Sequence, residues 1–99
     1  MDKNEAIEKV RKYKNLLTKQ MNIEQVFLYG SYARGNYTED SDIDVAIVVR
    51  DLQGDFFSVN PLLWKLRRQI DDRIEPVIID INFDRAGFLD EIRKEGIEI

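Results

Sequence analysis

The chain has 99 residues, of which 43% are hydrophobic and 34% charged, and its net charge is −4. A chain of this length closes one small hydrophobic core, so we expect residues 1–99 to form a single domain. It contains no cysteine and no histidine, which excludes disulfides, thiolate zinc sites, Cys-His nucleophile pairs and Ser-His-Asp triads. Any acid–base or metal chemistry must therefore use carboxylates.

The negative net charge argues against general binding to nucleic acid or to anionic membranes. No apolar run approaches the roughly 18 residues of a membrane-spanning helix, and the N-terminal segment lacks the apolar core of a signal peptide. We therefore expect a cytoplasmic protein that makes no use of a membrane.

The first half of the chain predicts a long helix followed by two strands. Apolar residues recur at helical spacing in residues 2–20, which predicts an amphipathic helix with Ala6, Val10, Tyr13 and Leu17 on its inner face. The run IEQVFLY, residues 23–29, predicts a strand that closes at Gly30. Further along, we expect a tight or one-turn helical segment at 31–35, a polar loop at 36–41 and a second strand at 42–49.

The second half predicts two more helices around a third strand. Residues 51–60 resemble a connecting loop, and Asn60–Pro61 predicts the start of a helix that ends near Asp71. Residues 74–81 predict a strand, and Pro76 indicates a sheet edge because proline cannot donate to a ladder. We expect Asp84 to cap a last helix through Lys94, with Gly96 as its stop and a short strand at 97–99. The predicted fold class is α/β (α+β), a small mixed sheet with helices packed on one face.

Two aspartates stand at the start of the second strand. Alternate side chains of a strand share a face, so Asp42 and Asp44 are predicted to lie side by side. At about 4 Å, two like charges repel by roughly 1 kcal/mol in water and roughly 4 kcal/mol near a protein surface. A divalent cation offsets that repulsion, and oxygen ligands with room for substrate phosphates suit Mg²⁺.

The preceding turn predicts a phosphate site. A glycine that ends a strand lets the backbone approach an anion closely, so we expect Gly30 and Ser31 to hold a triphosphate. Arg34 could add positive charge to a phosphate oxygen, or it could instead pair with Glu39 or Asp40 at the surface. A metal beside a phosphate cradle is the arrangement that nucleotidyl transfer requires.

The stretch GSYARGNYTEDSDIDV, residues 30–45, resembles the signature of the minimal nucleotidyltransferase family in the DNA polymerase β-like superfamily. The resemblance is strong over residues 23–50, and the length and element order fit the whole minimal domain. It implies the polymerase β-like fold and a reaction with ATP that uses Mg²⁺, with two ions expected. It places Gly30 and Ser31 on the nucleotide phosphate and Asp42 and Asp44 on the metal.

Members of this family often work beside a helical HEPN partner protein, some as antitoxins that transfer AMP to a tyrosine of the paired toxin. The resemblance therefore implies such a partner, and it leaves a homo-oligomer open. Two alternatives remain: a binding module that neutralises a HEPN-type partner without catalysis, and a transferase directed at RNA or a small molecule.

The family also carries a third carboxylate on a later strand, as a metal ligand or as a base toward the acceptor. Glu75, at the start of the third strand, and Asp80, on its opposite face by parity, are both candidates. We favour Glu75 as a catalytic residue and metal ligand, with Asp80 as the alternative third acid.

Plainer interpretations stand beside these. Asp42 and Asp44 could form a solvated strand face, although aspartate is depleted in strands. Exposed acids at Glu75 and Asp80 could blunt an edge strand against aggregation. Trp64 with Arg67 and Arg68 could stack on RNA, but packing and solubility explain these side chains more simply. Phe56, Phe57 and Trp64 could instead form an apolar patch for a partner chain.

Overall fold

The computed structural model describes residues 1–50, 52, 56–84 and 87–99. Along these ranges the elements are α1 (Lys3–Thr18), β1 (Gln25–Tyr29), α2 (Ser31–Arg34), β2 (Ile43–Val49), α3 (Phe56–Arg67), β3 (Ile74–Asp80), the 3₁₀ turn η1 (Ile81–Phe83), α4 (Phe88–Glu95) and β4 (Ile97–Glu98). Most boundaries fall within two residues of the predicted ones, so the order of helices and strands follows the local sequence pattern.

The strands form one mixed sheet in the order β3-β2-β1-β4. β1 runs antiparallel to β2 and β4, whereas β2 and β3 run parallel. β3 therefore lies at an edge of the sheet, which confirms the interpretation of Pro76. The mixed α/β class is confirmed as well.

One face of the sheet packs against α1 and α3. The inward residues of α1 are fully buried, as the helical spacing predicts, and they meet the strand residues of the same face: Val26, Leu28, Val45, Ile47 and Ile74. Tyr13 also donates from its hydroxyl to the backbone oxygen of Leu63 at 2.7 Å, which joins α1 to α3. Burial raises the pKa of this tyrosine, so it remains a donor across the physiological range.

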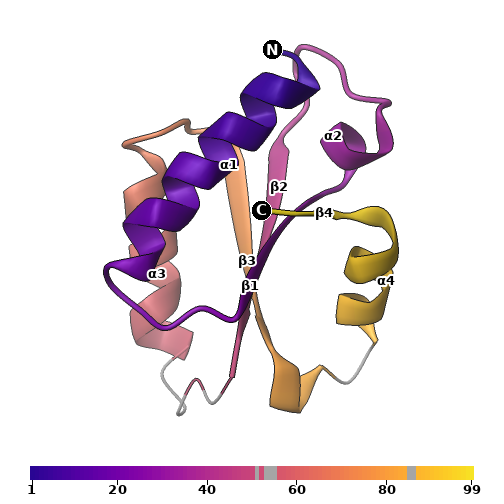
Figure 1. Ribbon diagram of the computed structural model, residues 1–99. Coiled ribbons are helices and arrows are strands. Elements are labelled where there is room, and N and C mark those ends of the chain that lie inside the picture. The colour runs from indigo at the N-terminus through magenta and orange to yellow at the C-terminus, as the bar shows by residue number, and fades with distance from the viewer. Residues whose placement is uncertain (51, 53–55, 85–86) are drawn as a thin grey trace.

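The opposite face packs against α4, so the prediction of helices on one face only is wrong. Figure 1 shows the sheet between α1 and α3 on one side and α4 on the other. Leu89 and Ile92 of α4 pack against Phe27, Ala46 and Val48. The reason is that β2 is apolar on both faces beyond Asp44, and each apolar face requires a cover.

α3 begins at Phe56, so the predicted start at Asn60–Pro61 is wrong. Pro61 lies inside the helix and lacks the N–H that would bond to the carbonyl of Phe57. The earlier start brings Val59, partly buried, against the main core. Residues 51 and 53–55 of the predicted loop lie outside the described ranges.

The last helix begins at Phe88, after Gly87, rather than next to Asp84. Asp84 still caps it, because its Oδ2 accepts a hydrogen bond from the backbone N–H of Leu89 at 2.9 Å. Gly96 ends the helix as predicted, whereas residues 85 and 86 lie outside the described ranges. Across the described part of the chain, every helix is too short or too polar to cross a membrane.

Candidate active site

Gly30 lies where β1 ends, in direct contact with an aspartate of β2. Tyr29 and Asp44 are Cα partners in the antiparallel ladder, so the next residue passes close beside the Asp44 carboxylate. A Cβ on residue 30 would lie 2.1 Å from Asp44 Oδ2. The backbone of Gly30 also has φ +73° and ψ −150°, a region that only glycine adopts readily. Both observations explain why glycine stands here.

The residues after Gly30 form one helical turn, α2. The backbone N–H of Arg34 donates to the oxygen of Gly30 at 3.0 Å, and that of Gly35 donates to the oxygen of Ser31 at 2.9 Å. The turn is held against the protein by Tyr32, which is fully buried and whose ring stacks on that of Tyr37 at 4.5 Å. The predicted helical turn is confirmed, and it fixes Ser31 at the end of β1.

Asp44 of β2 and Glu75 of β3 lie side by side in the sheet, and Asp42 stands one residue before β2, close to both. Glu75 is the register partner of Asp44 in the parallel ladder. Burial raises the pKa of Asp44, the negative charge of Asp42 raises it further, and Arg34 lowers it. The pKa of Glu75 is raised first by partial desolvation, next by the charge of Asp42 and a hydrogen bond with it, and last by the charge of Asp44. The three carboxylates therefore lie close enough to affect one another's charge.

Asp80 lies elsewhere. It pairs with Val49 at the far end of β3, five residues from Glu75, or about 16 Å along an extended strand. Its carboxylate accepts backbone hydrogen bonds from Leu52 at 3.2 Å and Asn82 at 2.9 Å. Asp80 thus caps the turn that follows β3 and does not join the carboxylate group.

An ion-pair network holds the edge of this site. Asp71 pairs with Lys9 Nζ at 2.6 Å and with Arg73 Nη2 at 3.0 Å, and its side chain is 11% exposed. Hydrogen bonds from Arg73, with further bonding and charge from Lys9, hold the pKa of Asp71 well below its usual range. The backbone oxygen of Arg73 accepts from Ile43 N–H at 2.8 Å, and its guanidinium reaches the oxygen of Glu39 at 3.4 Å. The network therefore sets the start of β2 against β3.

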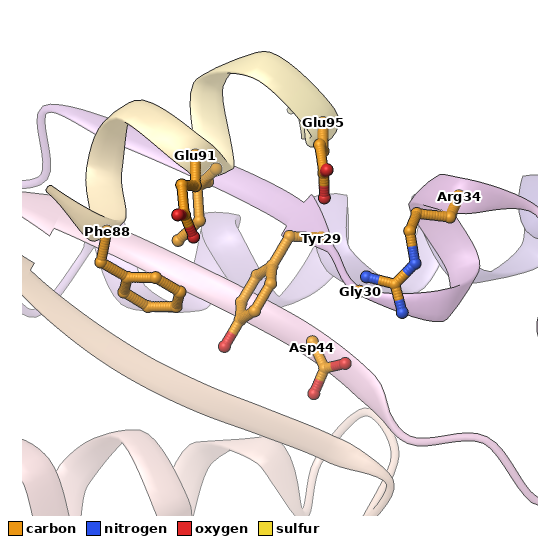
Figure 2. A pocket seen from close by; sticks show the side chains of 8 residues that line it. Tyr29, Gly30, Arg34, Asp44, Phe88, Glu91 and Glu95 are labelled. Atoms are coloured by element: carbon orange, nitrogen blue, oxygen red, sulfur yellow. The ribbon is translucent and has the colours of Figure 1, made fainter.

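A pocket of about 290 Å³ opens beside the carboxylates, between α4 and the end of β1. Figure 2 shows Arg34 and Asp44 at one end of it and Phe88 and Glu91 at the other. None of the ion pairs within the described ranges joins Arg34 to Glu39 or Asp40. Arg34 instead lines the pocket, so the surface-pair interpretation of this residue does not hold here.

Comparison with known families decides the identity of this fold. Residues 11–99 match the family model described as "Polymerase beta, Nucleotidyltransferase". The chain belongs to this family. It is a nucleotidyltransferase domain, as the resemblance of residues 30–45 implied.

Relatives of this nucleotidyltransferase carry related names. This chain is 29% identical over 99 residues to "Putative protein adenylyltransferase MJ0141" of Methanocaldococcus jannaschii, and the match covers 96% of this chain and 99% of the relative. It is 43% identical over 44 residues to "Putative protein adenylyltransferase MJ1379" of the same organism, covering 44% of each chain. A crystal structure titled a "putative nucleotidyltransferase" from Sulfolobus solfataricus shares the fold, with a TM-score of 0.65, 23% identity, and coverage of 95% of this chain and 85% of that chain.

The nucleotidyltransferase site offers oxygen ligands alone. Among the described residues, no group of three His, Cys, Asp or Glu side chains is arranged to hold a metal ion by itself. Asp42 and Asp44, one exposed and one half-buried, fit an ion that takes one or two carboxylates and completes its shell with water and phosphate, as Mg²⁺ does. The negative charge of Asp42 raises the pKa of Asp44, and a bound cation would relieve the repulsion that causes this shift.

Sequence reasoning missed four residues that border this pocket: Tyr29, Phe88, Glu91 and Glu95. Strand alternation could have found the first, because Tyr29 shares its face with Phe27 and directly precedes Gly30. Burial, with the charges of Asp44 and Glu75, raises the pKa of Tyr29 to about 12. The other three lie on α4, and no local pattern places that helix over the site.

Proposed function

We propose that this domain transfers a nucleoside monophosphate, AMP from ATP, to an acceptor group of a partner protein. One relationship supports the proposal above all. The Gly30 turn touches Asp44 so closely that a Cβ would clash with its carboxylate, which sets a candidate phosphate cradle beside a candidate metal site. The names of the M. jannaschii relatives favour an adenylyl group and a protein acceptor.

Each residue has a proposed role. Asp42 and Asp44 would hold Mg²⁺, which when bound neutralises phosphate charge and orients the triphosphate. The backbone of Gly30 and the hydroxyl of Ser31 would bind phosphate oxygens, and Arg34 would add a positive charge at the same end of the pocket. Glu75 would serve the acceptor rather than the metal, because no three carboxylates among the described residues are arranged to hold one ion, and Glu75 is the exposed register partner of Asp44.

The reaction balances with these groups. The acceptor oxygen forms a bond to the α-phosphorus of ATP while the bond from that phosphorus to the bridging oxygen of pyrophosphate breaks. Glu75 takes the proton that the acceptor hydroxyl loses, and pyrophosphate leaves with the electron pair of the broken bond. No oxidant or reductant is needed.

A protein acceptor and a HEPN-type partner fit the surface of α3. Phe57 is 86% exposed, Phe56 45% and Trp64 37%, an apolar group that a partner chain would cover. The guanidinium of Arg67 lies 4.6 Å from the centre of the Trp64 ring, so one face of that ring is already occupied. This contact makes base stacking, and hence an RNA acceptor, the less favoured choice. The cytoplasmic location and a homo-oligomer stay predictions.

The experiment that tests this function is incubation with Mg²⁺, ATP labelled at the α-phosphate, and the HEPN-type product of a neighbouring gene. We expect covalent label on the partner, and none when Asp44→Asn replaces the native domain. Mg²⁺ and ATP together should also raise the melting temperature. At an ATP concentration a hundredfold above the dissociation constant, binding adds about 2.7 kcal/mol to the unfolding free energy. Tight partner binding without label or thermal shift would instead identify a non-catalytic binding module.

A further inference from the structure

The pocket beside the carboxylates has two chemically different ends. Gly30, Arg34 and Asp44 line the end where the proposed function places phosphate and metal. The other end, here called the α4 end, is formed by Tyr29, Phe88 and Glu91 and carries no cation among its described lining residues. In Figure 2, Phe88 and Glu91 lie on the opposite side of Tyr29 from Arg34.

The α4 end contains a rigid aromatic wall. The rings of Tyr29 and Phe88 meet edge to face, with centroids 5.7 Å apart and planes at 85°. Phe88 is only partly buried by its contacts with the smaller core, so part of the ring remains open to a ligand. A flat apolar surface next to a phosphate site is suited to a planar base, which stacks on it.

Glu91 is the carboxylate of this end. It is exposed, lines the pocket and lies one helical turn before Glu95, which Figure 2 shows nearer to Gly30 and Arg34. Within the described ranges, neither takes part in an ion pair. A carboxylate repels phosphate oxygens and accepts hydrogen bonds from N–H and O–H groups. The part of a nucleotide that suits Glu91 is therefore the nucleoside, with its hydroxyls and ring amino group.

We propose that the α4 end of this pocket is the nucleoside subsite. Phe88 packs against the base, and Glu91 accepts hydrogen bonds from donors of the nucleoside. The inference rests on the proposed function, which supplies the phosphate end. At about 290 Å³ the whole pocket is at the small end of ligand sites, so a bound nucleotide leaves no room in it for the acceptor.

The test compares two ligands, ATP and inorganic tripolyphosphate, each titrated with Mg²⁺ against the whole chain. Tripolyphosphate reports the phosphate end alone. Phe88→Ala should weaken ATP binding about tenfold, the size of one lost base–aromatic stack, and leave tripolyphosphate binding unchanged. Glu91→Gln should also weaken ATP binding, yet leave tripolyphosphate binding equal or stronger because a repelling charge is removed.

Matched controls are Phe83→Ala, an exposed phenylalanine away from this pocket, and Asp90→Asn, an exposed acid of α4 that does not line it. Both should bind ATP as the native chain does. Unchanged tripolyphosphate binding also reports that Phe88→Ala is folded, and Glu91→Gln tests the subsite at an exposed position that folding does not need.

Analogues separate the two sources of hydrogen-bond donors. A triphosphate of purine riboside lacks the amino group, and dATP lacks the 2′-hydroxyl. If the native chain binds one of these analogues more weakly than ATP, and Glu91→Gln removes that difference, the subsite is supported. Native ATP affinity in both Phe88→Ala and Glu91→Gln would overturn the subsite alone. A native chain that binds neither ATP nor tripolyphosphate would overturn the proposed function together with it.

Discussion

Gly30 and Asp44 stand in contact across β1 and β2, with no space for a side chain on residue 30. Gly30→Ala would place a Cβ 2.1 Å from Asp44 Oδ2 in a backbone region unsuited to alanine. We expect a loss of about 1–3 kcal/mol in unfolding free energy and a loss of Mg²⁺-dependent ATP binding. Denaturant unfolding and nucleotide titration measure the two effects.

The control for that change is Gly35→Ala. Gly35 also has a positive φ, +88°, but a Cβ there meets no atom within 4 Å. It should lose about 1 kcal/mol of stability from backbone strain and keep its nucleotide affinity. Equal loss of nucleotide binding in both variants would show that strain, rather than the contact with Asp44, determines the effect.

Asp42→Asn and Asp44→Asn should each reduce nucleotidyl transfer by at least about a hundredfold, since each removes a proposed metal ligand. Without metal, both variants should be as stable as the native chain or slightly more stable, because repulsion between the carboxylates is relieved. Label transfer and thermal unfolding in chelator measure these outcomes. Asp40→Asn, in the exposed loop, is the control, and native turnover in either site variant would refute the mechanism.

Glu75→Gln and Asp80→Asn distinguish the two candidate third acids. Glu75→Gln should lower transfer by about 10²–10⁴-fold while ATP binding stays within about twofold, because a base acts on the acceptor and not on the nucleotide. Asp80→Asn should keep full transfer, since Asp80 caps the turn after β3. Single-turnover rates at saturating ATP provide the comparison. The reverse pattern would assign the role to Asp80.

Asp71→Asn tests the network that holds the start of β2 against β3. In the folded protein the pKa of Asp71 lies below its ordinary value of about 3.9. The ionised carboxylate therefore stabilises the fold fully at pH values above about 3.9, and this stabilisation is lost as the pH falls through the pKa of the folded state. We expect the variant to lose about 1–2 kcal/mol of unfolding free energy at pH 7. Its deficit should shrink as the pH is lowered below about 4, as urea unfolding at several pH values would measure. A deficit that grows on acidification would contradict this assignment.

Local patterns predicted several features of the site correctly. The alternation of Asp44, Ala46 and Val48 on one face depends only on the two-residue period of a strand, and the structure retains it, whereas Asp42 lies one residue before β2. Helical spacing likewise identified the buried face of α1. The start of α3 was predicted wrongly: Asn60–Pro61 lies inside the helix, whose first turns pack Val59 against the main core, a tertiary contact that the local signal does not contain.

The sequence by itself determined which side chains share an element and a face, because those relationships follow from bond geometry and repeat over a few residues. Tertiary structure decided what meets across elements. The parallel register of β2 and β3 brings Glu75, and not Asp80, next to Asp44, and the second apolar face of β2 draws α4 over the pocket. Both outcomes depend on burying apolar surface between segments far apart in the chain, which no local spacing encodes.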